Sequence, residues 1–157
     1  MRPTTDLAKE GLFNILTNQF DVQDIKVLDL FAGTGSITYE FASRGCKEIT
    51  SVDINYKCVQ FIKQTIRALD FQNINIVKQD AFKYIKRCKD SFGIIFADPP
   101  YELAGVELIA ELVFNNKLLE KNGWLIVEHK KEVDFSKHKC FLRQRKYGNV
   151  NFSIFNV

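Results

Sequence analysis

Apolar runs of strand length alternate with segments of helical period along most of the chain. The runs are short and rich in β-branched residues, which predicts buried strands at 26–31, 48–52, 74–78, 92–97 and 124–128. The segments between them and the one before the first run predict helices at 6–16, 34–44, 55–69, 81–87 and 106–115. Regular alternation of strand and helix is typical of a parallel sheet with helices on both faces.

The first helix has a start signal and an apolar face. Thr4 or Thr5 can cap its first turn, and Leu7, Phe13 and Leu16 recur at roughly helical spacing. We expect this N-terminal helix, 5–17, to cover one side of the sheet.

The alternation of strands and helices stops near the C-terminus. The segments 140–145 and 150–155 flank Tyr147-Gly148-Asn149, which is a turn signal, with no room for a helix between them. The sequence therefore predicts an α/β fold, mostly parallel, that ends in an antiparallel hairpin. With 157 residues, 46% of them apolar, we expect residues 1–157 to form a single domain.

Composition argues against several classes of protein. No run approaches 18 apolar residues, and the N-terminus lacks the pattern of an export signal, so we expect a cytoplasmic monomer with no membrane contact. The four cysteines show no metal-ligand spacing, which predicts reduced thiols and no metal. Basic residues crowd 130–146, namely Lys130, Lys131, Lys137, Lys139, Arg143, Arg145 and Lys146. A phosphate-facing patch and a solvated edge hairpin explain them equally well.

A glycine turn follows the first predicted strand and opens a helix. Gly33 and Gly35 allow tight backbone and close approach of a ligand. Asp53 ends the next strand, where a carboxylate can accept both hydroxyls of a ribose. Asp80 and Ala81 follow the third strand and could read an adenine edge, although Asp80 could equally be a helix cap.

Two adenosine cofactors fit this spacing. A dinucleotide site favours Gly-x-Gly-x-x-Gly, whereas position 38 is Thr, and Asp29 would lie near the phosphates. The same carboxylate is favourable beside a sulfonium or ammonium group. The pattern therefore favours S-adenosyl-L-methionine.

Asp98-Pro99-Pro100-Tyr101 follows the fourth predicted strand, at the edge where open α/β sheets bind substrates. A planar base could stack on Tyr101 while its amino group donates to the Asp98 carboxylate and to the Pro99 carbonyl. This motif predicts chemistry on a nucleobase amine. The alternative is that it is only a turn that ends the strand.

The whole chain resembles the RsmD family of bacterial methyltransferases, which modify the N2 amine of a guanine in 16S ribosomal RNA. The resemblance is carried by Arg2-Pro3-Thr4-Thr5-Asp6, the 30–35 loop, Asp98-Pro99-Pro100-Tyr101 and Lys146-Tyr147-Gly148-Asn149. It implies a Rossmann-like class I fold with a seven-stranded sheet, and the 16S rRNA or the assembled small subunit as partner. It also implies that the N-terminal helix, near Thr5 and Asn14, closes over the cofactor.

Under this resemblance each functional residue has an expected role. Catalysis falls on Asp98, Pro99 and Tyr101, and substrate binding on Pro100, Tyr101, Arg143 and Lys146. Cofactor contacts fall on Asp29, Phe31, Gly33, Gly35, Asp53, Ile54, Asp80 and Ala81.

The chain departs from the family pattern at two places. Thr38 stands where members often have another glycine, which we expect to change helix packing rather than activity. The basic segment that usually precedes Arg-Pro-Thr is absent from this sequence, which bears on RNA docking. An adenine-N6 DNA methyltransferase and a non-catalytic RNA-binding domain are the alternative functions.

Overall fold

Seven strands form one mixed sheet in the computed structural model, which describes residues 4–157. They are β1 (Lys26–Leu30), β2 (Glu48–Asp53), β3 (Ile74–Lys78), β4 (Phe92–Ala97), β5 (Leu119–His129), β6 (Phe141–Tyr147) and β7 (Val150–Asn156). Their order is β3-β2-β1-β4-β5-β7-β6. The first five run parallel and β6 and β7 form an antiparallel hairpin, as the sequence predicted. The hairpin joins the sheet through β7, which is antiparallel to β5.

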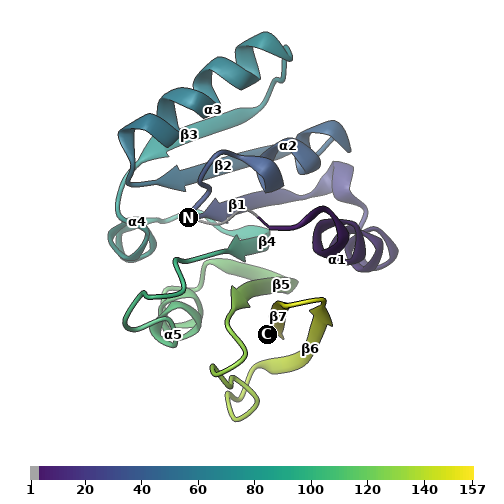
Figure 1. Cartoon of the computed structure of the whole chain (residues 1–157), viewed down its shortest axis with the longest axis vertical. Coiled ribbons are helices and arrows are strands. Elements are labelled where there is room, and N and C mark those ends of the chain that lie inside the picture. The colour runs from purple at the N-terminus through teal and green to yellow at the C-terminus, as the bar shows by residue number, and fades with distance from the viewer. Residues whose placement is uncertain (1–3) are drawn as a thin grey trace.

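Five α-helices cover the sheet (Figure 1): α1 (Asp6–Gln19), α2 (Ser36–Ser43), α3 (Tyr56–Ala68), α4 (Ala81–Arg87) and α5 (Leu108–Asn115). A short 3-10 helix, Val22–Asp24, leads into β1. Buried side chains of α1 and α2 pack on one sheet face in one cluster, and those of α4 and α5 pack on the other face in a second cluster. The sheet is thus buried on both faces, which explains its continuous apolar runs.

The start of α1 follows its predicted cap. The Thr5 hydroxyl accepts a hydrogen bond of 3.2 Å from the Ala8 N–H, so the helix begins at Asp6. The prediction that Leu7 belongs to the apolar face is wrong, because this side chain lies on the outer side of the helix and is 64% exposed. Ala8 and Leu12 occupy the buried stripe with Phe13 and Leu16.

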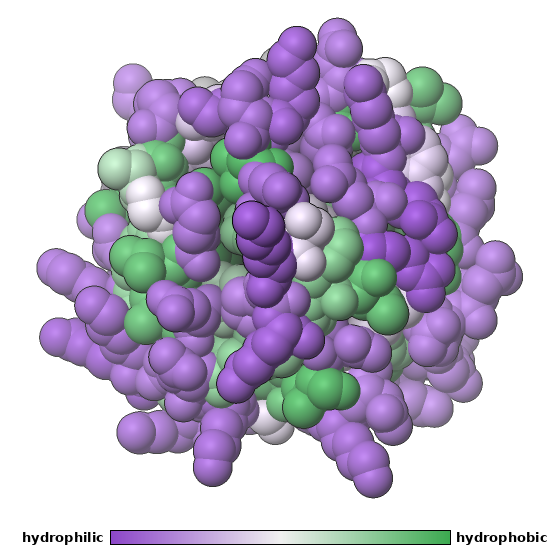
Figure 2. All heavy atoms as spheres, turned by 90° about the horizontal axis from the view of Figure 1, so that it is seen from below, coloured by the Kyte–Doolittle hydropathy of each residue, from purple (hydrophilic) through white to green (hydrophobic). Residues whose placement is uncertain are grey.

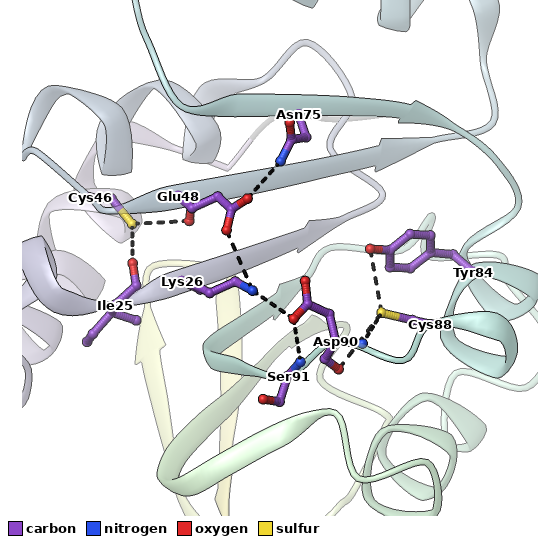
Figure 3. A network of polar contacts seen from close by, with 9 residues as sticks. All are labelled: Ile25, Lys26, Cys46, Glu48, Asn75, Tyr84, Cys88, Asp90 and Ser91. Atoms are coloured by element: carbon purple, nitrogen blue, oxygen red, sulfur yellow. Dashed lines mark hydrogen bonds and ion pairs between the residues drawn. The ribbon is translucent and has the colours of Figure 1, made fainter.

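A polar cluster ties the amino ends of the strands together, at the edge opposite to their carboxyl ends (Figure 3). The Lys26 ammonium lies 2.7 Å from Oδ1 of Asp90 and 3.5 Å from Oε2 of Glu48, and Asn75 donates to the same Glu48 carboxylate. The hydrogen bond from Lys26 lowers the pKa of Asp90. These contacts link β1 to β2, β3 and the segment before β4. They lie at the amino ends of the strands, away from the carboxyl ends where the candidate site lies.

Candidate active site

The carboxyl ends of β1 and β4 lie side by side at the centre of the sheet. Leu30 pairs with Ala97, so the residues that follow these two strands emerge next to each other. The strand order reverses at this point, which is where open α/β sheets bind ligands. A cavity of about 190 Å³ opens there. Its lining comprises Thr4, Asp29, Phe31, Ala32, Gly33, Thr34, Ser36, Ile37, Cys58, Phe96 and Asp98.

The glycine turn between β1 and α2 is held in shape by Asp53. Gly33 and Gly35 have φ values of 59° and 92°, in the left-handed region that favours glycine. The Gly33 N–H donates a hydrogen bond of 2.8 Å to Oδ2 of Asp53, and the Asn55 N–H donates one of 2.8 Å to Oδ1. The Asp53 carboxylate therefore fixes the turn, and each oxygen keeps a second lone pair for a further donor.

Asp29 is a buried carboxylate at the floor of the cavity. The Thr38 hydroxyl donates to its Oδ2 at 2.7 Å, and the Ser51 hydroxyl lies in hydrogen-bond contact with that of Thr38. Because a hydroxyl has one hydrogen, Ser51 donates to Thr38 whenever Thr38 donates to an ionised Asp29. Desolvation raises the pKa of Asp29 to about 7, against the opposing effect of the Thr38 hydrogen bond.

The remaining predicted cofactor residues lie outside this lining. Ile54 follows β2 and is 63% exposed. The Asp80 side chain accepts from the Lys83 N–H at 3.1 Å and caps α4, the alternative that the sequence left open. Ala81, the first residue of α4, packs in the core, and Gly35 lies against the Tyr39 ring.

The Asp98-Pro99-Pro100-Tyr101 turn begins directly after β4. Its first two residues are buried and its last two are partly exposed. The Thr4 hydroxyl, from the segment before α1, lies 3.5 Å from Oδ2 of Asp98 and donates to Glu128 at 2.6 Å. The segment before α1 thus reaches the predicted catalytic carboxylate, while Asn14 is an exposed residue on α1. Arg2 and Pro3 of the same motif lie outside the described residues.

A groove of about 360 Å³ adjoins Tyr101 at the same edge of the sheet. Three lysines and one acid give its lining a net positive charge; the lining residues are Tyr101, Lys130, Lys131, Glu132, Lys146, Asn149 and Asn151. Figure 2 looks onto the end of the molecule formed by α5 and the β6–β7 hairpin and shows mainly hydrophilic side chains there. Part of the predicted basic patch therefore faces the predicted base site.

The two predicted RNA-binding residues of β6 are separated. Lys146 lines the groove, whereas Arg143 lies three positions earlier in the strand and on its other face. The Arg143 guanidinium stacks over the Trp124 ring, with its carbon 5.5 Å from the ring centroid. The structure brings Lys146, and not Arg143, beside Tyr101.

Glu128 was not singled out by the sequence analysis. It is only 2% exposed, near the carboxyl end of β5, and it shares a small cavity with Pro99, Pro100 and Tyr101. The available signal was a lone acid after the apolar run 124–127, the pattern that Asp98 shows after β4. Its neighbour His129 is a satisfied core residue, because its ring nitrogens contact the Lys130 carbonyl at 2.8 Å and the Ser153 hydroxyl at 2.7 Å.

Metal-binding clusters and membrane-spanning helices are absent from the described part of the chain. Among residues 4–157, no three histidine, cysteine or acidic side chains are grouped so that they could hold a metal ion. Within the same residues, no helix combines the length and apolar character needed to cross a bilayer. All four cysteines are free thiols.

Solved structures share this architecture. Hypothetical protein TTHA0928 of Thermus thermophilus superposes with a TM-score of 0.88 at 23% identity, covering 99% of this chain and 88% of its own. The T. thermophilus 16S rRNA N2 G1207 methyltransferase RsmC, solved with AdoMet and guanosine, gives a TM-score of 0.76 at 19% identity, covering 98% and 43%. The fold is that of a Rossmann-like class I methyltransferase.

Sequence comparison narrows the class to one family. The family model described as Conserved hypothetical protein 95 matches residues 1–156. Ribosomal RNA small subunit methyltransferase D of Escherichia coli K12 is 32% identical over 128 residues, covering 82% of this chain and 61% of the relative. Its namesake in Haemophilus influenzae is 26% identical over 161 residues, covering 99% and 82%. The chain belongs to the RsmD family of methyltransferases.

Proposed function

We propose that this protein transfers a methyl group from S-adenosylmethionine to the exocyclic N2 amine of a guanine in 16S ribosomal RNA. One observation carries the proposal: a single cavity is lined both by Asp29 and the glycine turn and by Asp98 of the Asp-Pro-Pro-Tyr turn. A methyl donor held by the first set of residues faces an amine held by the second. The names of the RsmD relatives support ribosomal RNA as the substrate.

The charge of the cavity fits S-adenosylmethionine better than a dinucleotide. Among residues 4–157, its lining includes the carboxylates of Asp29 and Asp98 and no lysine or arginine side chain. A pyrophosphate would meet buried negative charge, whereas a sulfonium and an ammonium group are attracted to it. Asp29 would attract the cationic methionine end, and the Asp53 oxygens would accept from the ribose hydroxyls. The bound cofactor supplies an electrophilic methyl group on its sulfonium.

The Asp-Pro-Pro-Tyr turn prepares the acceptor amine. The lone pair of a guanine N2 is delocalised into the ring, which makes the amine a poor nucleophile. Hydrogen bonds from its two N–H groups to the Asp98 carboxylate and the Pro99 carbonyl favour a pyramidal nitrogen and free that pair. Stacking on Tyr101 holds the ring, and Asp98 stabilises the positive charge that develops on nitrogen and would accept the proton that the methylated amine releases. Alignment of donor and acceptor accounts for much of the acceleration.

The basic groove beside Tyr101 places the RNA backbone. The target guanine has to leave its stack to enter the pocket, because its amine cannot meet the methyl group within a helix. Lys130, Lys131 and Lys146 line the exit from the base site, where they can contact the phosphates on either side of the extruded nucleotide. Under this proposal, the three lysines of the groove form a phosphate-facing surface.

The alternative acceptor is an adenine N6 amine in DNA, which an Asp-Pro-Pro-Tyr pocket could also grip. Methyl transfer assays with purified protein distinguish guanine N2 in ribosomal RNA from adenine N6 in DNA as the acceptor. We expect labelled methyl groups to enter undermodified small ribosomal subunits and not duplex DNA, and Asp98→Ala to abolish transfer while it retains cofactor binding. Labelling of DNA alone would contradict the proposal. Cofactor-independent RNA binding without any transfer would favour a non-catalytic domain.

A further inference from the structure

Two buried carboxylates, not one, lie at the position proposed for the acceptor base. Asp98 follows β4 and Glu128 lies near the end of β5, and these strands are parallel neighbours with Ala97 paired to Val127. Glu128 is 2% exposed and Asp98 is 8% exposed. The mechanism proposed above uses Asp98 only and gives Glu128 no role.

The Thr4 hydroxyl shows how close the two carboxylates are. It donates to Oε1 of Glu128 at 2.6 Å and lies 3.5 Å from Oδ2 of Asp98, so one small donor reaches both acids. Thr4 and Asp98 also line the cavity of about 190 Å³ proposed for the methyl donor. Glu128 lines the adjacent small cavity with Pro99 and Tyr101. Glu128 therefore borders the base site on the side next to the amine-binding turn.

The Watson–Crick edges of the two candidate purines differ at the position beside the amine. Guanine presents its N2 amine and an N1–H, which are two adjacent donors. Adenine presents its N6 amine next to an unprotonated N1, which is an acceptor. An ionised carboxylate only accepts, so a pair of carboxylates matches guanine and opposes the adenine N1 lone pair.

We propose that Glu128 is a specificity-determining residue that accepts a hydrogen bond from guanine N1–H while Asp98 and Pro99 hold the N2 amine. This inference rests on the proposed function and deepens it, because it assigns the choice of guanine to one side chain. Thr4 moves its hydroxyl aside, or shares the Glu128 carboxylate, when the base enters.

The test uses 2-aminopurine, which keeps the 2-amine and has an acceptor in place of N1–H. Small subunits are reconstituted from 16S RNA that carries either guanine or 2-aminopurine at the modified position, after that position has been mapped with wild-type protein. We expect the wild-type protein to methylate the 2-aminopurine substrate at least about tenfold more slowly, because the carboxylate then faces a lone pair. Equal turnover of the two substrates by the wild-type protein would overturn the role of Glu128.

The Glu128→Gln variant gives a crossed readout, because its amide N–H₂ can donate to an unprotonated N1. We expect this variant to methylate the guanine substrate more slowly than the wild type does. The ratio of its rates on guanine and on 2-aminopurine should fall toward one or below it. An equal loss on both substrates would mean a structural role only and would overturn the inference. Glu120→Gln, an exposed position at the other end of β5, is the matched control and should keep the wild-type preference.

Failure of the inference differs from failure of the proposed function. Wild-type protein that methylates guanine N2 without discriminating against 2-aminopurine removes only Glu128 from the account. Wild-type protein that methylates no guanine removes the proposed function, and the inference with it.

Discussion

The Gly33 N–H donates to the Asp53 carboxylate at 2.8 Å, and this bond joins the turn after β1 to the end of β2. The carboxylate thereby orients a turn whose Gly33 lines the cavity and whose backbone has to lie close to a ligand. Backbone donors to a buried charge are among the stronger hydrogen bonds in proteins. The glycine turn is thus shaped before the cofactor arrives.

Replacing Asp53 should affect both the turn and cofactor binding. Asp53→Ala removes the acceptor of two backbone N–H groups, and we expect it to lower the free energy of unfolding by about 1–3 kcal/mol. Cofactor affinity should fall as well, because the ribose hydroxyls then have no carboxylate to donate to. Denaturant unfolding and isothermal titration with S-adenosylmethionine measure the two effects. Asp21→Asn, an exposed side chain without a capping bond, should change neither; unaltered affinity in Asp53→Ala would contradict the assignment.

Thr38 provides a second test, because its hydroxyl is buried between Asp29 and Ser51. Thr38→Val keeps the shape and removes the donor, so we expect a loss of about 1–3 kcal/mol in the free energy of unfolding and a further rise in the pKa of Asp29. Thr38→Ser should retain most of the wild-type behaviour. Indistinguishable unfolding curves for the valine variant and the wild type would show that the hydroxyl does not support Asp29.

Cofactor affinity should depend on pH through Asp29. Burial raises the pKa of this carboxyl to about 7, so it loses its charge as the pH falls below that value. The neutral acid no longer attracts the cationic methionine end, and the dissociation constant should rise by up to about tenfold per pH unit below pH 7. Titration calorimetry from pH 5.5 to 8.5 measures this dependence. Asp29→Asn should bind weakly at every pH, and a flat profile for the wild type would refute the role of Asp29.

The same carboxyl affects the stability of the cofactor-free protein with the opposite sign. Its folded pKa lies near 7 and its ordinary value is 3.8, so the folded state binds more protons between these limits. Stability should therefore fall as the pH rises from about 4 to about 7, by up to about 1.4 kcal/mol per pH unit, and should level off above 7. Comparing urea unfolding of the wild type and Asp29→Asn isolates this contribution, and identical pH profiles would contradict it.

The basic groove predicts a salt-dependent contribution to RNA binding. Changing Lys130, Lys131 and Lys146 singly to Gln should weaken binding of small subunits and reduce the slope of log K against log salt by about 0.7–0.9 for each phosphate that is no longer neutralised. Lys121→Gln, at the amino end of β5, is the matched control. If the three groove variants kept the wild-type slope, the groove would not be the docking surface.

Much of this arrangement could be predicted from the sequence because burial on both faces of a parallel sheet leaves continuous apolar runs. The run at 92–97 matched its fully buried strand, and the order of motifs along the chain placed Asp29 and Asp98 at strand ends. The segment 74–78 also matched its strand, although this edge strand is only partly buried. The direction in which individual side chains point was harder to predict. Leu7 fits the helical period yet points outward, and Arg143 and Lys146 share a strand but not a face.

Contacts between distant segments could not be predicted from spacing alone. Thr4 meets Glu128 across 124 positions, and Thr38 reaches Asp29 only because α2 packs over β1. A hydroxyl or a lone acid in these places looks like a cap or a strand end until the fold is known. Asp80 is the opposite example. The sequence offered two roles for it, a helix cap and an adenine contact, and the structure shows the cap.

The nature of the methylated nucleoside tests the central claim most directly. Small subunits from cells that lack this protein are incubated with the purified protein and S-adenosylmethionine, and their 16S RNA is digested to nucleosides for mass spectrometry. The account predicts N2-methylguanosine that is absent from the Asp98→Ala reaction. N6-methyladenosine, or no new methylated nucleoside in the wild-type reaction, would contradict it.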